Sequence, residues 1–200
     1  MRLLLFSDLH CHAAAAEEIV RQAQGMDLVV GAGDFGNMRQ MTDECIRMLR
    51  QITCPAVLVP GNAESYEELQ AAAQQWPSAT VLHGTGAVVQ GISFFGIGGA
   101  IPQTPFGDWS YDFSETDAER LLADCPLDAI LVSHSPPLGV VDTDQRGRSL
   151  GSVTVHDVVL RRRPRLVVCG HIHASGGQKA WLGETPVVNA GPAGMEWVLE

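Results

Sequence analysis

Three repeats of one pattern, a short apolar run followed by a polar loop and a helix-forming segment, constrain the fold of this chain most strongly. The apolar runs are 2–6, 28–32 and 56–59, and helix-forming residues follow at 13–24, at 42–51 and from Ser65 onward. Alternating strands and helices predict parallel strands joined by right-handed crossovers. The polar loops should therefore open at one edge of a sheet.

The middle of the chain has a different pattern. Short β-rich segments at 87–90 and 92–97 are separated by glycine, which predicts a hairpin and a sheet that becomes mixed. Residues 101–111 form a loop rich in Pro, Gly and aromatic residues, and both a lid over a site and plain surface packing are consistent with it.

The second half of the chain again predicts strands and capped helices. Helices are predicted to begin at Ser114, with Asp117 three residues on, and at Thr154, with Asp157 three residues on. Further strands are predicted at 129–132, 166–169, 178–182, 186–189 and 196–199. The segment between the first of these strands and the second helix, 139–151, is expected to be a flexible loop.

Composition limits the class of protein. The 200 residues suit a single domain over 1–200, and a net charge of −10 with one lysine disfavours non-specific binding to nucleic acid or anionic lipid. We expect a cytoplasmic protein, because the N-terminal apolar stretch ends at Ser7 and no run of about 20 apolar residues follows. Five scattered cysteines argue against disulfides and a thiolate zinc site. The sequence leaves open whether the protein forms a homo-oligomer.

Five polar motifs each follow a separate predicted strand. They are Asp8-x-His10, Gly33-Asp34, Gly61-Asn62, His134 and Gly170-His171-x-His173. Each alone has an ordinary explanation, since a lone histidine is more often a surface or core residue than a ligand. Parallel strands bring their carboxyl ends to one edge of a sheet, so together the motifs predict one site.

The donor types indicate which ions this site would hold. Carboxylate, amide and imidazole donors suit two first-row divalent ions about 3.5–4 Å apart with one carboxylate between them, which favours manganese or iron, with zinc as a further candidate. The glycines at 33, 61 and 170 are expected to let the backbone turn sharply before each ligand.

These motifs, in this order, resemble those of the calcineurin-like metallophosphoesterases, whose pattern is Asp-x-His, Gly-Asp, Gly-Asn-His-Asp/Glu, His and Gly-His-x-His. The resemblance runs from Asp8 to His173, and Pro136-Pro137-Leu138-Gly139 looks similar to the small metallophosphoesterase-domain phosphodiesterase branch. It implies a four-layer α/β/β/α sandwich of two mixed β-sheets with a dinuclear metal site at the carboxyl ends of the strands.

The resemblance also divides the ligands between two metal ions. One ion would be held by Asp8, His10, Asp34 and His173, and the other by Asp34, Asn62, His134 and His171. Asp34, Asn62 and His134 would also serve catalysis: Asp34 would bridge the two ions, and Asn62 and His134 would orient the phosphate while a hydroxide between the ions attacks phosphorus in line.

One position departs from the family pattern. Ala63 stands where the family usually has a histidine that protonates the leaving oxygen, and loss of a general acid typically costs about 10²–10⁴ in rate. Relatives without this histidine are often associated with diesters, so a phosphodiesterase acting on a small-molecule phosphoester is the leading hypothesis. His12 is a candidate replacement for the missing acid, and a surface histidine is the alternative reading of this residue.

Two other functions stay open. One is a phosphomonoesterase acting on a small metabolite or a phosphoprotein. The other is a non-catalytic interaction scaffold of the same fold, against which the seven intact ligand positions argue, because clustered polar residues are costly to keep. Residues that could line a substrate pocket are Phe106, Trp109, Asp142, Arg146 and Arg148.

Overall fold

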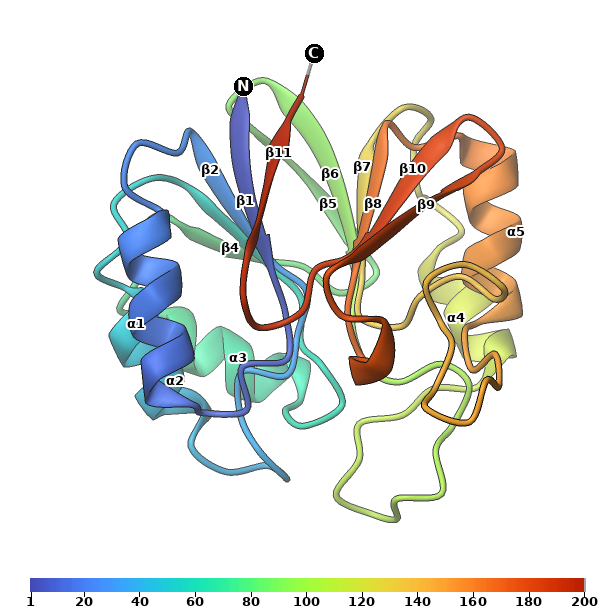
Figure 1. Cartoon of the computed structure of the whole chain (residues 1–200), viewed down its shortest axis with the longest axis horizontal. Coiled ribbons are helices and arrows are strands. Elements are labelled where there is room, and N and C mark those ends of the chain that lie inside the picture. Colours follow the sequence, from blue (N-terminus) through green and yellow to red (C-terminus); the bar gives the residue numbers. More distant parts are fainter. Residues whose placement is uncertain (200) are drawn as a thin grey trace.

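Two β-sheets pack face to face in the computed structural model, which describes residues 1–199 (Figure 1). The first sheet has the order β11-β1-β2-β3-β4, with β1 Arg2–Phe6, β2 Leu28–Gly31, β3 Ala56–Leu58, β4 Ala79–Val81 and β11 Met195–Val198. The second has the order β5-β6-β7-β8-β10-β9, with β5 Thr85–Val89, β6 Ile92–Ile97, β7 Ile130–Ser133, β8 Leu166–Cys169, β9 Gln178–Leu182 and β10 Thr185–Asn189.

Helices cover the outer face of each sheet (Figure 1). The first sheet carries α1 Ala13–Gln22, α2 Thr42–Leu49 and α3 Tyr66–Ala73, and the second carries α4 Glu115–Leu121 and α5 Val153–Arg162, while η1 His173–Ser175 is a single 3₁₀ turn. Both sheets are mixed, because β11 runs antiparallel to β1, β5 to β6, and β9 to β10. The predicted four-layer α/β/β/α sandwich is confirmed.

The inner strands β2, β3, β7 and β8 are buried along their whole length, which explains why their sequences are almost continuously apolar, whereas the edge strands β5, β9 and β11 are partly exposed. Leu4 and Phe6 of β1 pack into the core beneath the helices, whereas Leu3 and Leu5 join a second core between the sheets. This central core also contains Val132 and residues of β3, β6, β8 and β10, so it draws on both sheets. Within residues 1–199, no helix is long and apolar enough to cross a membrane.

The sequence missed one strand, and one predicted helix cap was wrong. The strand β4 was not predicted, because three residues at 79–81 give too short an apolar run, and pairing with β3 is what makes them a strand. Helix α5 is capped by Ser152, whose Oγ accepts the Val155 N–H at 3.1 Å, and not by Thr154. The Thr154 hydroxyl instead donates to the Glu115 carbonyl of α4 at 3.1 Å.

The carboxyl ends of the parallel strands in both sheets open at the same end of the molecule, the lower end in Figure 1. Loops after β1, β2 and β3 meet loops after β7 and β8 there. Backbone hydrogen bonds tie these loops together: the Asp8 N–H donates to the Gly33 carbonyl at 2.9 Å and the Gly170 N–H to the His134 carbonyl at 3.0 Å. The Ser7 N–H, which donates to the Gly191 carbonyl at 3.0 Å, joins the first sheet to the second where the polar motifs lie.

Candidate metal centre

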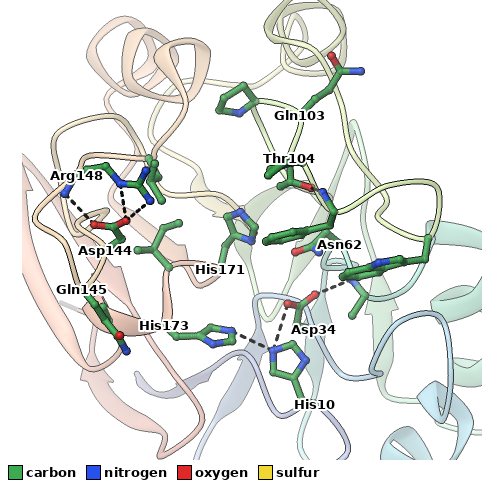
Figure 2. Close-up of a pocket in the computed structure, with 18 of the residues that line it drawn as sticks. His10, Asp34, Asn62, Gln103, Thr104, Asp144, Gln145, Arg148, His171 and His173 are labelled. Atoms are coloured by element: carbon green, nitrogen blue, oxygen red, sulfur yellow. Dashed lines mark hydrogen bonds and ion pairs between the residues drawn. The ribbon is translucent and has the colours of Figure 1, made fainter.

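All seven predicted ligand residues lie at this junction, and the structure gathers their donor atoms into two groups. The first group is Asp8, His10, Asp34 and His173, and the second is Asp34, His134 and His171, with the donor atoms of each group within 4.8 Å of one another. Asn62 joins the second group, because its Oδ1 lies 3.2 Å from His134 Nε2. Asp34 is shared between the groups, which matches the division that the family resemblance implies (Figure 2).

The backbone is left-handed at several of these residues. The φ angles are +56° at Asp8, +43° at His10, +56° at Asp34 and +66° at His171. Side chains larger than glycine seldom adopt this region, and where they do the strain often marks a functional site. The sharp turns therefore fall on the polar residues themselves.

The expected role of the preceding glycines needs a partial correction. Gly33 has a φ of +93° and does make a sharp turn, but Gly61 and Gly170 do not have positive φ values. A Cβ at Gly61 would overlap the Asp34 carboxylate, and one at Gly170 would lie 2.6 Å from Ser7. These two glycines are needed because other loops approach their backbone closely, a reason that the sequence alone does not reveal.

Hydrogen bonds fix the direction of the histidines. His10 Nδ1 lies 3.2 Å from the Gly36 carbonyl and His134 Nδ1 lies 2.8 Å from the Ala32 carbonyl, so each Nδ1 carries the proton and donates it. The Nε2 lone pair of each ring is left facing the other donors. Histidines that ligate metals are commonly oriented by a bond of this kind from the other ring nitrogen.

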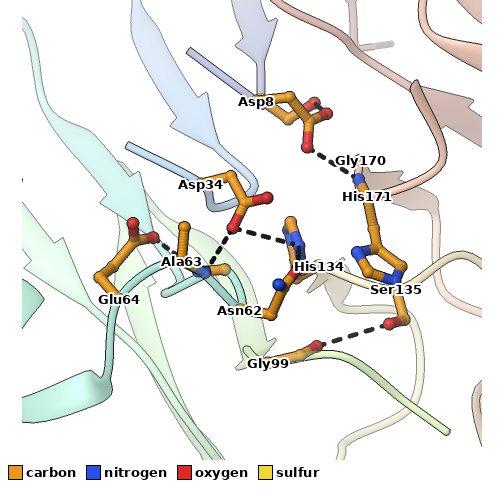
Figure 3. A network of polar contacts seen from close by, with 12 residues as sticks. Asp8, Asp34, Asn62, Ala63, Glu64, Gly99, His134, Ser135, Gly170 and His171 are labelled. Carbon is orange, nitrogen blue, oxygen red and sulfur yellow. Dashed lines mark hydrogen bonds and ion pairs between the residues drawn. The ribbon is translucent and has the colours of Figure 1, made fainter. Parts of the chain in front are cut away.

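Hydrogen bonds also fix the carboxylates (Figure 3). Asp8 Oδ1 accepts the His171 N–H at 3.0 Å, and Asp8 Oδ2 accepts the Ser7 hydroxyl at 2.6 Å. Asp34 Oδ1 accepts the Ala63 N–H at 2.8 Å. Each carboxylate is thus locked on one side and keeps further lone pairs for a cation.

Electron-pair donors face one another in both groups. His10 Nε2 lies 3.0 Å from His173 Nε2 and 3.5 Å from Asp34 Oδ2, and His134 Nε2 lies 3.5 Å from Asp34 Oδ1. Lone pairs at these separations repel unless a proton or a metal cation lies between them. The donor set of carboxylate, imidazole and amide groups therefore fits two divalent ions of the first transition row.

The pKa values of the two histidines in the second group are shifted in opposite directions. Burial and the repulsion of His134 lower the pKa of His171 to about 3, so this ring is neutral and ready to bind a metal ion. Burial works against a charge on His134, but attraction by Asp34 and Asp8 raises the pKa of His134 overall. Metal binding needs the neutral form of His134, so an ion bound there would compete with a proton for this ring.

The pKa values of the two carboxylates, Asp8 and Asp34, are also shifted in opposite directions. Burial raises the pKa of Asp8 despite the opposing attraction of His134. Burial also opposes ionisation of Asp34, yet His134, His10 and the Ala63 N–H together hold the pKa of Asp34 below its ordinary value. Asp34, the shared residue, is therefore the more acidic of the two carboxylates.

Comparison with protein families agrees with this geometry. The model of the calcineurin-like phosphoesterase superfamily domain matches residues 1–198. The chain belongs to the calcineurin-like phosphoesterase superfamily. Members of this superfamily are metal-dependent phosphoesterases, which places the chain among the phosphoric ester hydrolases with a centre for divalent metal ions.

Solved structures share the fold of this calcineurin-like phosphoesterase at low sequence identity. TT1561 of Thermus thermophilus is 21% identical with a TM-score of 0.76, over 96% of this chain and 90% of that one. An archaeal phosphodiesterase is 13% identical with a TM-score of 0.53, over 96% and 84%. A dimetal phosphatase from Danio rerio is 12% identical with a TM-score of 0.58, over 94% and 86%. Among proteins with curated functions, none matches.

Glu64 is part of the calcineurin-like motif, but its position in the site was not predicted. Its carboxylate is fully buried and accepts the Gly61 N–H at 2.7 Å and the Gly36 N–H at 2.8 Å. It thereby joins the loop after β3 to the loop after β2. Burial and the nearby Asp34 charge raise the pKa of Glu64 to about 7.

Ser110 and Asp112 are further residues of the site that the sequence did not reveal. The Asn62 side-chain amide donates to Ser110 Oγ at 3.0 Å, and the Ser110 hydroxyl donates to Asp112 Oδ1 at 2.5 Å. This chain of bonds turns Asn62 Oδ1 toward His134. No local pattern marks these residues, because Ser110 and Asn62 are 48 positions apart.

His12 belongs to neither group of predicted metal ligands. His12 precedes α1, where its Nδ1 accepts the Ala15 N–H at 3.3 Å, so it acts as the N-cap of that helix. It is exposed and does not line the pocket at the metal centre. The position of His12 therefore gives no support to a role as replacement for the missing acid.

A pocket of about 660 Å³ opens over the metal centre (Figure 2). Of the residues suggested from the sequence, Phe106, Trp109 and Arg148 line it, whereas Asp142 and Arg146 do not. The buried Asp142 carboxylate instead accepts the N–H groups of Gly139 and Gly151, both at 2.9 Å, and so holds the loop 139–151 together.

Proposed function

We propose that this calcineurin-like phosphoesterase is a phosphodiesterase that acts on a small-molecule phosphoester and uses two divalent metal ions. The residues proposed to hold the ions are Asp8, His10, Asp34, Asn62, His134, His171 and His173. The convergence of their donor atoms in two groups that share Asp34 supports this assignment. Manganese and iron are the proposed ions, and zinc is the alternative.

When bound, the two ions would neutralise phosphate oxygens and lower the pKa of a water molecule toward neutrality. Residues of the chain would fix where the ions and the phosphate lie. Asp34, locked by the Ala63 N–H, sits between the two groups. Asn62 and His134 face each other across 3.2 Å in the second group and would orient the phosphate.

The proposed preference for diesters follows from the residue at position 63, Ala63. It lines the pocket beside Asp34, and its methyl group offers no proton to a leaving oxygen. A phosphate monoester also carries one more negative charge than a diester, and among residues 1–199 the only Lys or Arg side chain that lines the pocket, Arg148, is already paired with Asp144 at 2.7 Å. A singly charged diester with a good leaving group fits this site best.

A phosphomonoesterase is the second candidate. The solved structures do not choose between the two, because an archaeal phosphodiesterase and a dimetal phosphatase are both similar to the chain at identities that show only the fold. The test is to load metal-free protein with manganese, iron or zinc and measure kcat/KM on bis(p-nitrophenyl) phosphate and on p-nitrophenyl phosphate. We expect the diester to be favoured, and a higher kcat/KM on the monoester would reject the proposal.

Asp34→Asn tests the two-metal assignment within the same assay. The amide keeps the shape of the carboxylate but removes the charge shared by both groups. We expect loss of hydrolysis together with loss of bound metal, seen by elemental analysis. Activity retained at the wild-type metal content would contradict the assignment, and wild-type protein that takes up no metal would favour the non-catalytic scaffold.

Ala63→His tests the preference itself. A histidine there could protonate the leaving oxygen, an effect worth about 10²–10⁴ in rate for substrates with poor leaving groups. We expect the ratio of monoester to diester hydrolysis to rise, with Ala63→Asn as a control that adds bulk without a suitable acid. An unchanged ratio would show that Ala63 does not set the preference.

A further inference from the structure

Two loops form the walls of the pocket above the metal centre. One wall comes from residues 102–109, with Phe106 and Trp109, and the other comes from residues 144–150, with Arg148 and Leu150 (Figure 2). His171 and Asp34 lie at the floor. A substrate whose phosphate reaches the floor must therefore place an ester arm between these walls.

The first wall carries a flat aromatic surface. The rings of Phe106 and Trp109 are stacked, with centroids 5.7 Å apart and planes only 4° from parallel. Phe106 is 51% exposed, although a large apolar side chain normally loses free energy when left in water. The pair thus offers ring surface to the pocket that the rest of the described chain does not cover.

This wall is held in place from below. The Asp112 carboxylate accepts the Thr104 N–H at 2.6 Å, the Thr104 hydroxyl at 2.7 Å and the Ser110 hydroxyl at 2.5 Å. The Tyr111 N–H donates to the Asn62 carbonyl at 3.0 Å. The aromatic pair lies between these anchors, so its position relative to Asn62 is set before a ligand binds.

The second wall, formed by residues 144–150, presents no net positive charge to the pocket. Arg148 is the one cationic side chain among the residues that line the pocket, and its guanidinium donates twice to Asp144 Oδ2, at 2.9 and 2.7 Å. Asp144 lines the pocket beside it, so the pair is neutral overall. An arm bearing a second phosphate would enter without a free cation to meet it.

From these features we propose that the substrate is a singly charged phosphodiester with one uncharged, planar aromatic arm, which stacks on the Phe106–Trp109 pair. The inference rests on the proposed function, since it assumes that the phosphate is held at the floor of the pocket. It adds a binding site for the arm that does not react. Phe106 and Trp109 are specificity-determining residues in this proposal.

Binding of simple diesters, measured under conditions in which the manganese-loaded protein does not detectably hydrolyse them, tests the proposal separately from turnover. Diphenyl phosphate and dicyclohexyl phosphate have the same charge and similar size, but only the first has planar rings. Isothermal titration of the manganese-loaded protein should show diphenyl phosphate binding about three- to tenfold more tightly, the factor expected for an aromatic stacking pair. Equal affinities, or tighter binding of dicyclohexyl phosphate, would overturn the proposal.

Variants identify the surface responsible. Phe106→Leu and Trp109→Leu should each bring the ratio of the two affinities close to one while metal content stays unchanged. Trp181→Leu is the matched control, because Trp181 is an exposed aromatic residue on β9 that does not line the pocket. A ratio unchanged in both pocket variants would reject the aromatic pair as the binding surface.

A charged probe tests the other wall. Diphenyl phosphate with a carboxylate on one ring should bind more weakly than diphenyl phosphate, and tighter binding would show that Arg148 recognises a charged arm. Failure of the inference and failure of the proposed function are distinguishable. The former appears as a lost binding preference, and the latter appears as absence of diester hydrolysis even when the binding preference is present.

Discussion

Ser7 shows how a single residue prepares a ligand. Its buried hydroxyl accepts the Gly191 N–H at 2.9 Å and donates to Asp8 Oδ2 at 2.6 Å, which leaves Asp8 only a limited range of orientations. Ser7→Ala should weaken metal binding about 10- to 100-fold, the usual cost of losing such a supporting partner. Competition with a chelator measures the change.

Ser93→Ala is the control for this prediction, since Ser93 lies on β6, away from the metal centre. Equal metal affinity in Ser7→Ala and wild-type protein would show that Asp8 needs no support from the hydroxyl.

His12 has a structural role that can be separated from catalysis. Loss of an N-cap side chain costs about 0.5–2 kcal/mol in the free energy of unfolding, so His12→Ala should destabilise the protein modestly while kcat on an aryl diester stays unchanged. His12→Asn supplies a better cap and should restore stability. Urea unfolding and steady-state kinetics give the two readouts, and a large fall in kcat in both variants would restore His12 as a proton donor.

The residues that ligate in the proposal could be predicted because each follows its strand directly. Asp8, Asp34 and His171 stand at the first turn after an apolar run, where the topology of a parallel sheet fixes their place. Ser110 and Asp112 could not be predicted in this way. Their effect on Asn62 depends on a long loop folding back, and no periodicity encodes that contact.

At the scale of elements, the loop 101–111 depends on Asp112 for its shape. Asp112→Ala removes the acceptor of three hydrogen bonds, from Thr104 and Ser110. We expect faster proteolytic cleavage within the loop and a higher KM for aryl diesters. Asp108→Ala, in the same loop but exposed, is the control, and identical cleavage rates in the two variants would contradict the anchoring role.

Helix α5 shows why element boundaries were less predictable than element types. Glu115 of α4 accepts the Val153 N–H at 3.0 Å and the Thr154 N–H at 2.9 Å, and so satisfies the first turn of α5 from another helix. A capping pattern read along the chain cannot include such a partner. The helix itself was predictable, because Val155, Val158 and Val159 form one buried face.

At the scale of the whole molecule, the metal-free protein should lose stability in acid partly through His171. Its pKa is lowered from 6.5 to about 3, so an unfolded chain binds a proton at His171 in this range and the folded chain does not. The stability that this residue contributes is present above pH 6.5 and is lost as the pH falls from 6.5 toward 3.

NMR titration of the ring checks the first part of this prediction, and a midpoint near pH 6.5 would contradict it. Urea unfolding across the same range checks the second part. The acid dependence should be shallower in His171→Gln, which cannot take up the proton.

The order of the layers was predictable, but the sheet that the last strand joins was not. Strand β11 pairs antiparallel with β1, with Arg2 opposite Val198, and so joins the two most distant parts of the chain. The predicted strand at 196–199 had no feature that assigned it to either sheet. Contact with Leu3 and Leu5 in the central core, not a local signal, determines its place.

Each group of proposed metal ligands takes members from both sheets, and this has a consequence for synthesis. Asp8, His10, Asp34 and Asn62 come from loops of the first sheet, whereas His134, His171 and His173 come from loops of the second. A ribosome releases the first set long before the last two histidines. A nascent chain therefore completes the donors of the second group only when His171 has emerged, and those of the first group only when His173 has emerged, so metal loading would belong to the end of translation.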